Sequence, residues 1–277
     1  MKPAIALVAL DIDGTLLTPS HQVTPATRVA IQEAREAGLA LVLASSRGPV
    51  GIRRVQRELD HLDGWLVAFQ GALVGRWRQP PGTLATVADH RIPEPIADHI
   101  MDLAVGSGLS ASRQAGMRWS APVIDDAIAR SAAITGETPV AEPCGKGHDS
   151  EPPHKIMVIA GKDALLPALA RFYGDLPAGV TAAYSHHNYV EITAADVTKG
   201  TGVAKVAETL GIPLHNCAAI GDGANDLAML AAVGLPIAMG QAGAQVRGAA
   251  RWTTDTNTHD GAAKALQKLL RFREDTS

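Results

Sequence analysis

Uninterrupted apolar runs, each followed by a short polar or glycine-rich segment, mark both ends of this chain. Residues 4–10 form such a run, which is typical of a strand buried on both faces. Thr24 and Pro25 resemble a helix cap and first helical residue, residues 26–37 have helical character, and residues 39–43 form a second apolar run. Strand, helix and strand in this order predict a βαβ unit with parallel strands and a right-handed crossover.

The same rhythm predicts a third strand at residues 66–69 and resumes near residue 189, with a helix at 201–210, strands at 216–220 and 235–238, and a last helix at 260–272. Between these blocks the pattern of apolar and polar residues changes after a turn cluster at residues 79–82. Residues 138–153 predict an irregular loop. We predict an α/β fold. Residues 1–82 and 188–277 form a doubly wound, mainly parallel sheet, and residues 83–187 form an inserted α+β cap.

Composition narrows the class of protein. The 277 residues are 46% hydrophobic, enough for one large or two ordinary globular domains, and a net charge of -3 argues against an extended nucleic-acid-binding surface. Cys144 and Cys217 lack metal-site spacing and are expected to be reduced packing residues. The N-terminus does not resemble a secretory signal, and no apolar segment has membrane-spanning length, so a cytoplasmic location without a membrane partner is expected.

Residues whose side chains could take part in catalysis or binding recur at one kind of position. They follow predicted strands or begin a predicted helix: Asp11 and Asp13, Ser45, Lys199, and the group Asp222, Asn225 and Asp226. Because the carboxyl ends of neighbouring parallel strands meet in one crevice, these side chains can converge despite their separation along the chain. They would supply oxygen ligands suited to Mg²⁺, a cation and N–H groups for an anion, and a carboxylate able to attack.

Each feature also has a structural interpretation. An isolated Asp-x-Asp is often only a turn, Ser45 and Ser46 can serve as helix caps, and Arg47 can be a solvated residue at a helix start. Glu191 suits structural pairing as well as a role in the site. The adjacent His186 and His187 would point to opposite faces of a strand, which disfavours a metal site there.

In combination, the motifs resemble those of the haloacid dehalogenase (HAD) superfamily, specifically the Cof-type phosphatases with a large α+β cap of the C2 type. The segment Asp11-Ile-Asp-Gly-Thr-Leu is similar to the first motif, residues 44–47 to the second, Lys199-Gly200 to the third, and residues 221–226 to the fourth. The resemblance covers essentially the whole chain and implies a HAD-like Rossmannoid core.

The resemblance implies a two-step transfer through an aspartyl-phosphate. Asp11 would attack phosphorus, and Asp13 would act as acid and then as base. Mg²⁺ would be held by the carboxylates of Asp11 and Asp222 and by the backbone carbonyl of Asp13. The phosphate would be bound by Ser45, the N–H of Ser46, Lys199 and Asn225, with Asp226 orienting Lys199 or a water.

Two positions depart from the family pattern. Ser46 replaces a more usual glycine, and Gln70 replaces asparagine in the pair that it forms with Gly71. Neither removes the catalytic set, but both weaken analogies about the leaving group. Gln70, Gly71, Arg47 and Lys155 are the candidate contacts to the rest of the substrate.

The expected activity is Mg²⁺-dependent hydrolysis of small phosphomonoesters, such as sugar phosphates or phosphorylated cofactors, by a monomer or a homodimer. A phosphotransferase or phosphomutase that uses the same intermediate is the nearest alternative, although Asp13 favours transfer to water. A non-catalytic regulator is less consistent with the complete motif set. A dinucleotide-dependent oxidoreductase is disfavoured, because no Gly-x-Gly-x-x-Gly follows the first strand.

Overall fold

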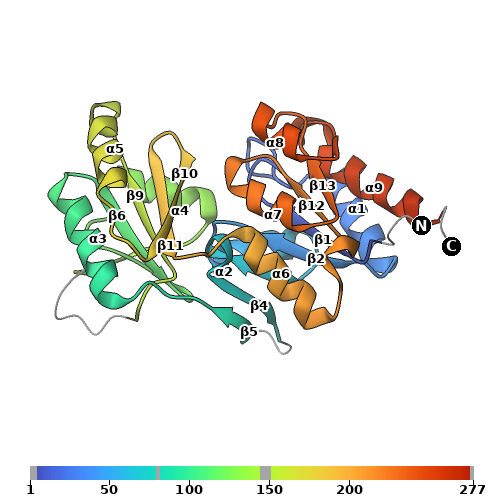
Figure 1. Cartoon of the computed structure of the whole chain (residues 1–277), viewed down its shortest axis with the longest axis horizontal. Coiled ribbons are helices and arrows are strands. Elements are labelled where there is room, and N and C mark those ends of the chain that lie inside the picture. The colour runs from blue at the N-terminus through green and yellow to red at the C-terminus, as the bar shows by residue number, and fades with distance from the viewer. Residues whose placement is uncertain (1–4, 79–81, 144–150, 275–277) are drawn as a thin grey trace. The chain divides into compact units, whose positions relative to one another are not determined.

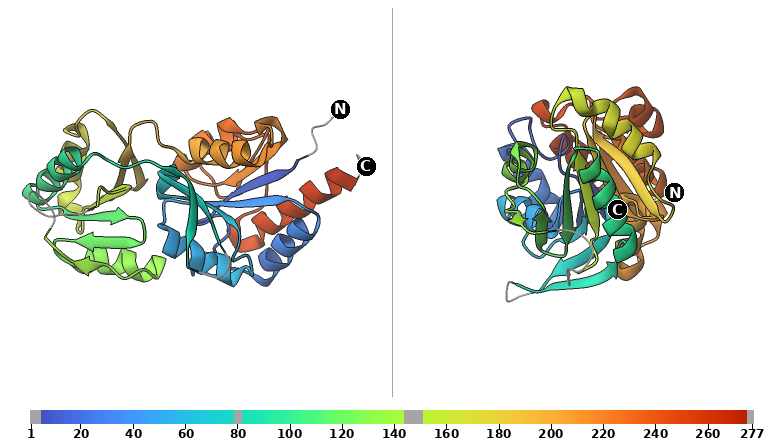
Figure 2. Two further views of the ribbon diagram at one scale, coloured as in Figure 1. Left: turned by 90° about the horizontal axis from the view of Figure 1, so that it is seen from below. Right: turned by 90° about the vertical axis from the view of Figure 1, so that its left-hand side faces the viewer.

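A computed structural model describes residues 5–78, 82–143 and 151–274 (Figure 1). The chain forms two compact units. The first comprises Met1–Ser45, Ile52–Ala88 and Thr198–Ser277, and the second comprises Ser46–Gly51 and Asp89–Val197. Figure 2 shows this arrangement by colour, because the blue and red ends of the chain share one body and the green to gold middle forms the other.

The first unit is organised around an eight-stranded sheet in the order β14-β13-β12-β1-β2-β3-β4-β5. Neighbours from β14 to β3 pair in parallel, and β4 joins β3 antiparallel. The strands are β1 (Leu7–Asp11), β2 (Ala40–Ala44), β3 (Trp65–Ala68), β4 (Leu73–Trp77), β5 (Leu84–Asp89), β12 (Cys217–Gly221), β13 (Leu235–Ala238) and β14 (Trp252–Thr253). Every residue of β1 and β12 is buried, as expected for central strands covered on both faces.

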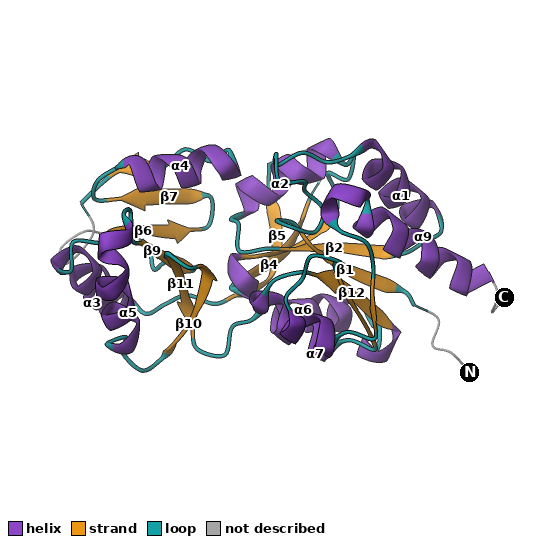
Figure 3. Ribbon diagram, turned by 90° about the horizontal axis from the view of Figure 1, so that it is seen from above, coloured by secondary structure: helices purple, strands orange, loops and turns teal. Residues whose placement is uncertain are grey.

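Helices cover both faces of this sheet (Figure 3). Helices α1 and α9 lie on one side, and α6 and α7 lie on the other, where Val203, Val206 and Met229 pack against Ala9 and Ala219. The helices associated with this sheet are α1 (Pro25–Glu36), α2 (Pro49–Glu58), α6 (Lys199–Leu210), α7 (Leu227–Ala232), α8 (Ala244–Ala249) and α9 (Gly261–Glu274). The expected doubly wound α/β architecture is confirmed.

The helix cap that the sequence predicts fixes the start of α1. The Thr24 side chain accepts a hydrogen bond from the Thr27 N–H, and Pro25 is the first helical residue, where its missing N–H costs nothing. The Thr24 hydroxyl also donates to Asp260 Oδ1 at 2.6 Å, which joins the start of α1 to the residue before α9.

The second unit contains a separate mixed sheet in the order β10-β11-β9-β6-β7-β8. Its strands are β6 (Ser110–Ala115), β7 (Arg118–Ala121), β8 (Val140–Ala141), β9 (Lys155–Ile159), β10 (Val180–His186) and β11 (Tyr189–Ala194), and its helices are α3 (Glu94–Gly106), α4 (Asp126–Thr135) and α5 (Leu166–Gly174). One apolar cluster joins α3 and α5 to the sheet, and another joins α4 to β7 and β9. The expected inserted α+β cap is confirmed.

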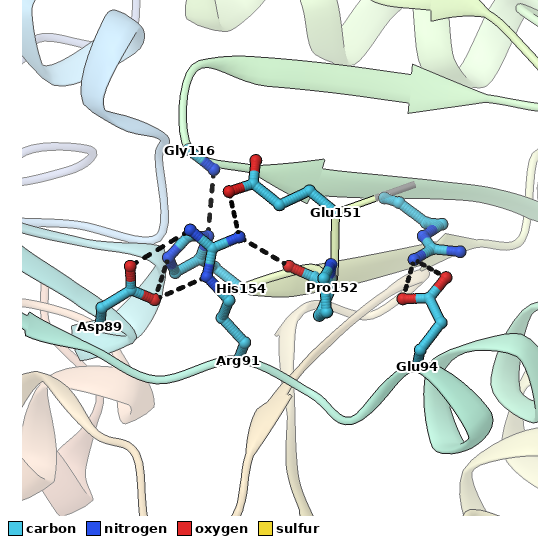
Figure 4. Close-up of polar contacts among 8 residues, drawn as sticks. Asp89, Arg91, Glu94, Gly116, Glu151, Pro152 and His154 are labelled. Carbon is cyan, nitrogen blue, oxygen red and sulfur yellow. Dashed lines mark hydrogen bonds and ion pairs between the residues drawn. The ribbon is translucent and has the colours of Figure 1, made fainter. Parts of the chain in front are cut away.

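A polar network lies within the second unit (Figure 4). His154 has no exposed surface; its Nδ1 accepts a hydrogen bond from the Gly116 N–H at 3.0 Å, and its Nε2 lies 3.0 Å from Asp89 Oδ1. Arg91 binds Asp89 at 2.7 Å and Glu151 at 2.8 Å. We call Asp89, Arg91, Glu151 and His154 the His154 network.

Some expectations fall outside these observations. Cys144 and the turn residues 79–81 are not among the described residues, and the domain boundaries expected from the sequence stay a prediction. Cys217 is buried in β12, as a packing residue should be. Within the described ranges, each helix is too short or too polar to cross a bilayer.

Candidate active site

The turn after β1 is fixed by its own backbone and by one glycine. Asp11 ends β1 with only 4% of its surface exposed, and the N–H groups of residues 15–17 all donate to the Ile12 carbonyl. Gly14 has φ +86°, and a Cβ atom there would lie 2.4 Å from a carboxylate oxygen of Asp222. Glycine is therefore needed at this position, both for its backbone conformation and for the close approach of Asp222.

Lys199 connects this turn to the other end of the chain. It is the first residue of α6, it is 1% exposed, and its Nζ donates to Asp11 Oδ1 at 2.6 Å and to Asp226 Oδ1 at 2.7 Å. A cation in the first turn opposes the helix dipole, so these two carboxylates are what stabilise it. Burial by itself lowers the pKa of Lys199, but Asp11 and Asp226 outweigh burial and raise this pKa above its ordinary value. Lys199 is thus charged throughout the physiological pH range.

Asp226 shapes the loop that follows β12. Its Oδ2 accepts hydrogen bonds from the N–H groups of Asp222 and Gly223, both at 3.0 Å, while Oδ1 accepts from Lys199. The carboxylate has no exposed surface. Asp226 therefore already accepts three hydrogen bonds, and these bonds hold the loop and Lys199 in place.

Asp11, Asp222, Asp226 and Lys199 form a site that we call the carboxylate cluster. One carboxylate oxygen from each aspartate lies within 4.8 Å of the others. Burial, and then the charges of Asp226 and Asp222, raise the pKa of Asp11 well above its ordinary value against the opposing charge of Lys199. Burial and Asp226 likewise raise the pKa of Asp222. Three carboxylates facing one ammonium form an acidic site that could bind a metal, and its oxygen ligands suit a hard divalent cation.

Ser45 lies at the same edge of the sheet. Asp11 and Ala44 are paired residues of neighbouring parallel strands, and Ser45 is the next residue along. Its N–H donates to the Val67 carbonyl at 2.9 Å, and its carbonyl accepts from the Gln70 N–H at 3.1 Å. The side chain is buried. Adjacent strand ends thus hold Ser45 beside the position of Asp11.

Asp13 and Asn225 are more accessible than the buried Asp11, Asp226 and Lys199. The Asp13 side chain is 41% exposed, and its Oδ1 lies 3.8 Å from Nδ1 of His21. Asn225 belongs to the short 3-10 helix η4 (Ala224–Asp226), directly before Asp226, and is partly exposed. Both residues belong to the loops that carry the cluster.

Gln70 and Gly71 form a strained turn, η1 (Phe69–Gly71), after β3. Phe69 and Gln70 have φ values of 52° and 59°, in the left-handed region that non-glycine residues rarely adopt. A Cβ on Gly71 would lie 2.2 Å from the Thr198 carbonyl, so only glycine lets this turn pack against the start of α6. The turn therefore locates both Ser45 and the helix that carries Lys199.

The other candidate substrate contacts belong to the second unit. Lys155 is buried, pairs with Glu191 at 3.1 Å and donates to the Ser46 carbonyl at 2.7 Å. Arg47 is also buried. The contribution of Ser46, Arg47 and Lys155 to substrate binding stays a prediction.

Sequence reasoning missed two residues at the site, one that touches the carboxylate cluster and one that contacts the turn at Gly14. The Thr15 hydroxyl donates to Asp222 Oδ1 at 3.3 Å, and the Gln241 amide donates to the Gly14 carbonyl. Thr15 is part of the first motif, so its proximity could have been anticipated. Gln241 lies in a glycine-flanked loop 227 residues from Gly14, and no local pattern indicates this contact.

The fold and the site together define a hydrolase class. A family model for haloacid dehalogenase-like hydrolases matches residues 8–266. The chain is 27% identical over 270 residues to the 5-amino-6-(5-phospho-D-ribitylamino)uracil phosphatase YcsE of Bacillus subtilis, with 95% of each chain covered. It is 26% identical over 281 residues to the pyridoxal phosphate phosphatase YbhA of Escherichia coli, covering 95% of this chain and 98% of that protein.

A solved haloacid dehalogenase-like hydrolase from Bacteroides thetaiotaomicron has the same fold, with a TM-score of 0.85 and 24% identity over 96% of this chain and 99% of that one. The chain belongs to the haloacid dehalogenase-like hydrolases. Within them it is a Cof-type phosphatase of subfamily IIB with an inserted C2 cap.

Proposed function

We propose that this phosphatase hydrolyses small phosphomonoesters with the help of Mg²⁺, through an aspartyl-phosphate formed on Asp11. The observation that carries the proposal is the buried contact of Lys199 with Asp11, beside Asp222 and at the carboxyl ends of adjacent strands. A carboxylate held by a permanent cation, in a site with excess negative charge, suits attack on a cation-neutralised phosphate.

The substrate class follows from the relatives. YcsE and YbhA are named for a phosphorylated ribitylaminouracil and for pyridoxal phosphate, which are both small phosphorylated metabolites. A sugar phosphate or a phosphorylated cofactor is accordingly the substrate class that we propose for this chain.

In the first step, an Asp11 oxygen forms a bond to phosphorus as the bond to the leaving oxygen breaks, and Asp13 gives that oxygen a proton. In the second, Asp13 takes a proton from the water that attacks phosphorus. The Asp11–phosphate bond breaks, inorganic phosphate leaves, and Asp11 is regenerated. The exposed position of Asp13 suits both proton transfers, because water and the leaving group can reach it.

In the proposed mechanism, some residues around Asp11 bind the phosphate and others bind the metal. Ser45, the N–H of Ser46, Lys199 and Asn225 bind phosphate oxygens. Mg²⁺ would be held by the carboxylates of Asp11 and Asp222 and the backbone carbonyl of Asp13, and it would screen the phosphate charge from the attacking carboxylate. Asp226 is left out of the ligand set, because three hydrogen bonds already occupy it, and instead orients Lys199.

The test is phosphate release from p-nitrophenyl phosphate with Mg²⁺ present. Asp11→Asn should lower kcat by at least about a thousandfold while the protein remains folded by circular dichroism, because an amide is a poor nucleophile. Asp102→Asn, in an exposed position on α3, is the matched control and should keep full activity. Undiminished turnover by Asp11→Asn would exclude Asp11 as the nucleophile.

Hydrolysis is separated from phosphotransfer by the products. Incubation with a sugar bisphosphate should release inorganic phosphate in step with substrate loss. Accumulation of an isomeric sugar phosphate without free phosphate would instead identify a mutase.

A further inference from the structure

Gln241 lies in the loop between β13 and α8, and both ends of its side-chain amide are engaged. Nε2 donates to the Gly14 carbonyl at 2.5 Å, and Oε1 accepts from the Asn257 N–H at 3.1 Å. Gly14 belongs to the turn after β1, and Asn257 begins the short 3-10 helix η5 (Asn257–His259). One exposed side chain therefore joins its own loop to two others, one of which is 227 residues away.

Gly14 lies directly against the Asp222 carboxylate, because a Cβ atom on Gly14 would lie 2.4 Å from one of its oxygens. The Gln241 amide therefore fixes the backbone against which Asp222 packs, with Nε2 donating to the Gly14 carbonyl and Oε1 accepting from the Asn257 N–H. Neither a carboxylate nor an apolar side chain of this length offers that combination.

A second side-chain hydrogen bond holds the same turn. The Asn257 side chain donates from Nδ2 to the Leu17 carbonyl at 2.8 Å. The turn after β1 is therefore held at Gly14 by Gln241 and at Leu17 by Asn257, while the Asn257 backbone anchors Gln241. The two bonds fix the turn after β1, which contains Asp13, against the loops that contain Gln241 and Asn257.

We propose that Gln241 is a positioning residue, which holds the turn at Gly14, and through it the Asp222 carboxylate packed against Gly14, in the arrangement that binds Mg²⁺. Gln241 is not itself a ligand; it acts through the backbone of the turn. The inference rests on the proposed function, because the metal belongs to that function. It adds a residue from outside the four sequence motifs to the site.

The test measures Mg²⁺ binding by isothermal titration calorimetry, without substrate. Gln241→Met keeps the length of the side chain but removes its donors and acceptor. We expect its Kd for Mg²⁺ to rise about tenfold, as for other residues that orient metal ligands. The melting temperature without Mg²⁺ should stay close to that of the unaltered protein, because the side chain is exposed. The concentration of Mg²⁺ that half-activates phosphate release should rise in parallel.

The matched control is Gln32→Met on the exposed face of α1. The Gln32 amide bonds only locally in the described structure, to Glu36 Oε1 at 2.8 Å, so Mg²⁺ affinity should not change. Gln241→Asn keeps the amide on a shorter stem and should weaken Mg²⁺ binding to an intermediate degree. It also decides the question if Gln241→Met does not fold.

Unchanged Mg²⁺ affinity in a folded Gln241 variant would overturn the inference, as would an equal loss of affinity in Gln32→Met. The proposed function fails separately, if the unaltered protein binds Mg²⁺ but releases no phosphate from any ester.

Discussion

Two groups of titratable side chains join distant parts of the chain: the carboxylate cluster of the first unit and the His154 network of the second. They shift the pKa values of their carboxylates in opposite directions. In the His154 network, the hydrogen bond from Arg91 leads the effects that lower the pKa of Asp89, so the charged form is favoured. In the carboxylate cluster, burial and neighbouring aspartates raise the pKa of Asp11 and Asp222, so their charges are disfavoured.

The difference indicates what each arrangement is for. Asp89 already has its cation and its hydrogen bonds within the protein, so the His154 network stabilises the fold by itself. Asp11 and Asp222 share Lys199 with Asp226, so the charged forms of these carboxylates are fully stabilised only when a further cation binds. A raised carboxyl pKa beside a fixed lysine thus marks a binding site, whereas a lowered one beside an arginine marks a structural pair.

The largest effect should come from removing the cation of the cluster. Lys199→Met should lower kcat for p-nitrophenyl phosphate by about a thousandfold, the loss typical of a group that stabilises transition-state charge. Measured per folded molecule, Lys205→Met should keep its activity, because Lys205 is a partly exposed residue of the same helix that pairs with Glu208. Retention of activity by Lys199→Met would remove the distinction between the two networks.

A change of pH should act on the His154 network. Burial, followed by the charge of Arg91, lowers the pKa of His154 to about 4, so the folded protein holds this ring neutral. The unfolded chain binds a proton near pH 6.5, so this stabilisation is complete above that pH and is lost as the pH falls toward 4. The full loss corresponds to about 3 kcal/mol.

Urea unfolding at pH 7 and pH 4.5 measures this effect. The free-energy difference between the unaltered protein and His154→Gln should shrink at the lower pH by roughly 2–3 kcal/mol, because glutamine does not titrate. His90→Gln, at an exposed position, should follow the unaltered protein. A constant difference between the unaltered protein and His154→Gln would show that His154 is not held neutral.

The smallest predicted effect is the stabilisation of the fold by Mg²⁺. At 100 times its Kd, Mg²⁺ should raise the free energy of unfolding by about 2.7 kcal/mol, because it binds only the folded cluster. Thermal melts with and without Mg²⁺ should lose this difference in Asp222→Asn. Glu151→Gln, in the His154 network, should retain it. Equal Mg²⁺ stabilisation of both variants would place the metal elsewhere.

Much of the core could be predicted from the sequence, because its elements depend on local patterns. The apolar runs around Leu10 and Val42 became neighbouring parallel strands, and Thr24 caps the helix between them. The contact between Asp11 and Lys199 followed from topology, because parallel strands bring their carboxyl ends to one edge.

Other features depend on tertiary contacts that no local pattern encodes. Strand β4 joins the core sheet antiparallel to β3 and β5 extends the sheet beyond it, although the sequence beyond Arg76 shows no parallel rhythm. The left-handed conformation of Gln70 contradicts the preference of its residue type and is imposed by its surroundings. The contacts of Gln241 can be found only in the three-dimensional structure, since its partners Gly14 and Asn257 come from two other loops.

The separation of the cluster along the chain has a consequence for synthesis. Asp11 leaves the ribosome 188 residues before Lys199, and β1 must wait still longer for its neighbour β12. Until then, a strand that is apolar except for Asp11 has one unpaired edge in the nascent chain, which favours its binding by chaperones. The carboxylate cluster therefore cannot form until the chain has been synthesised through Asp226, and no product truncated before that residue can contain it.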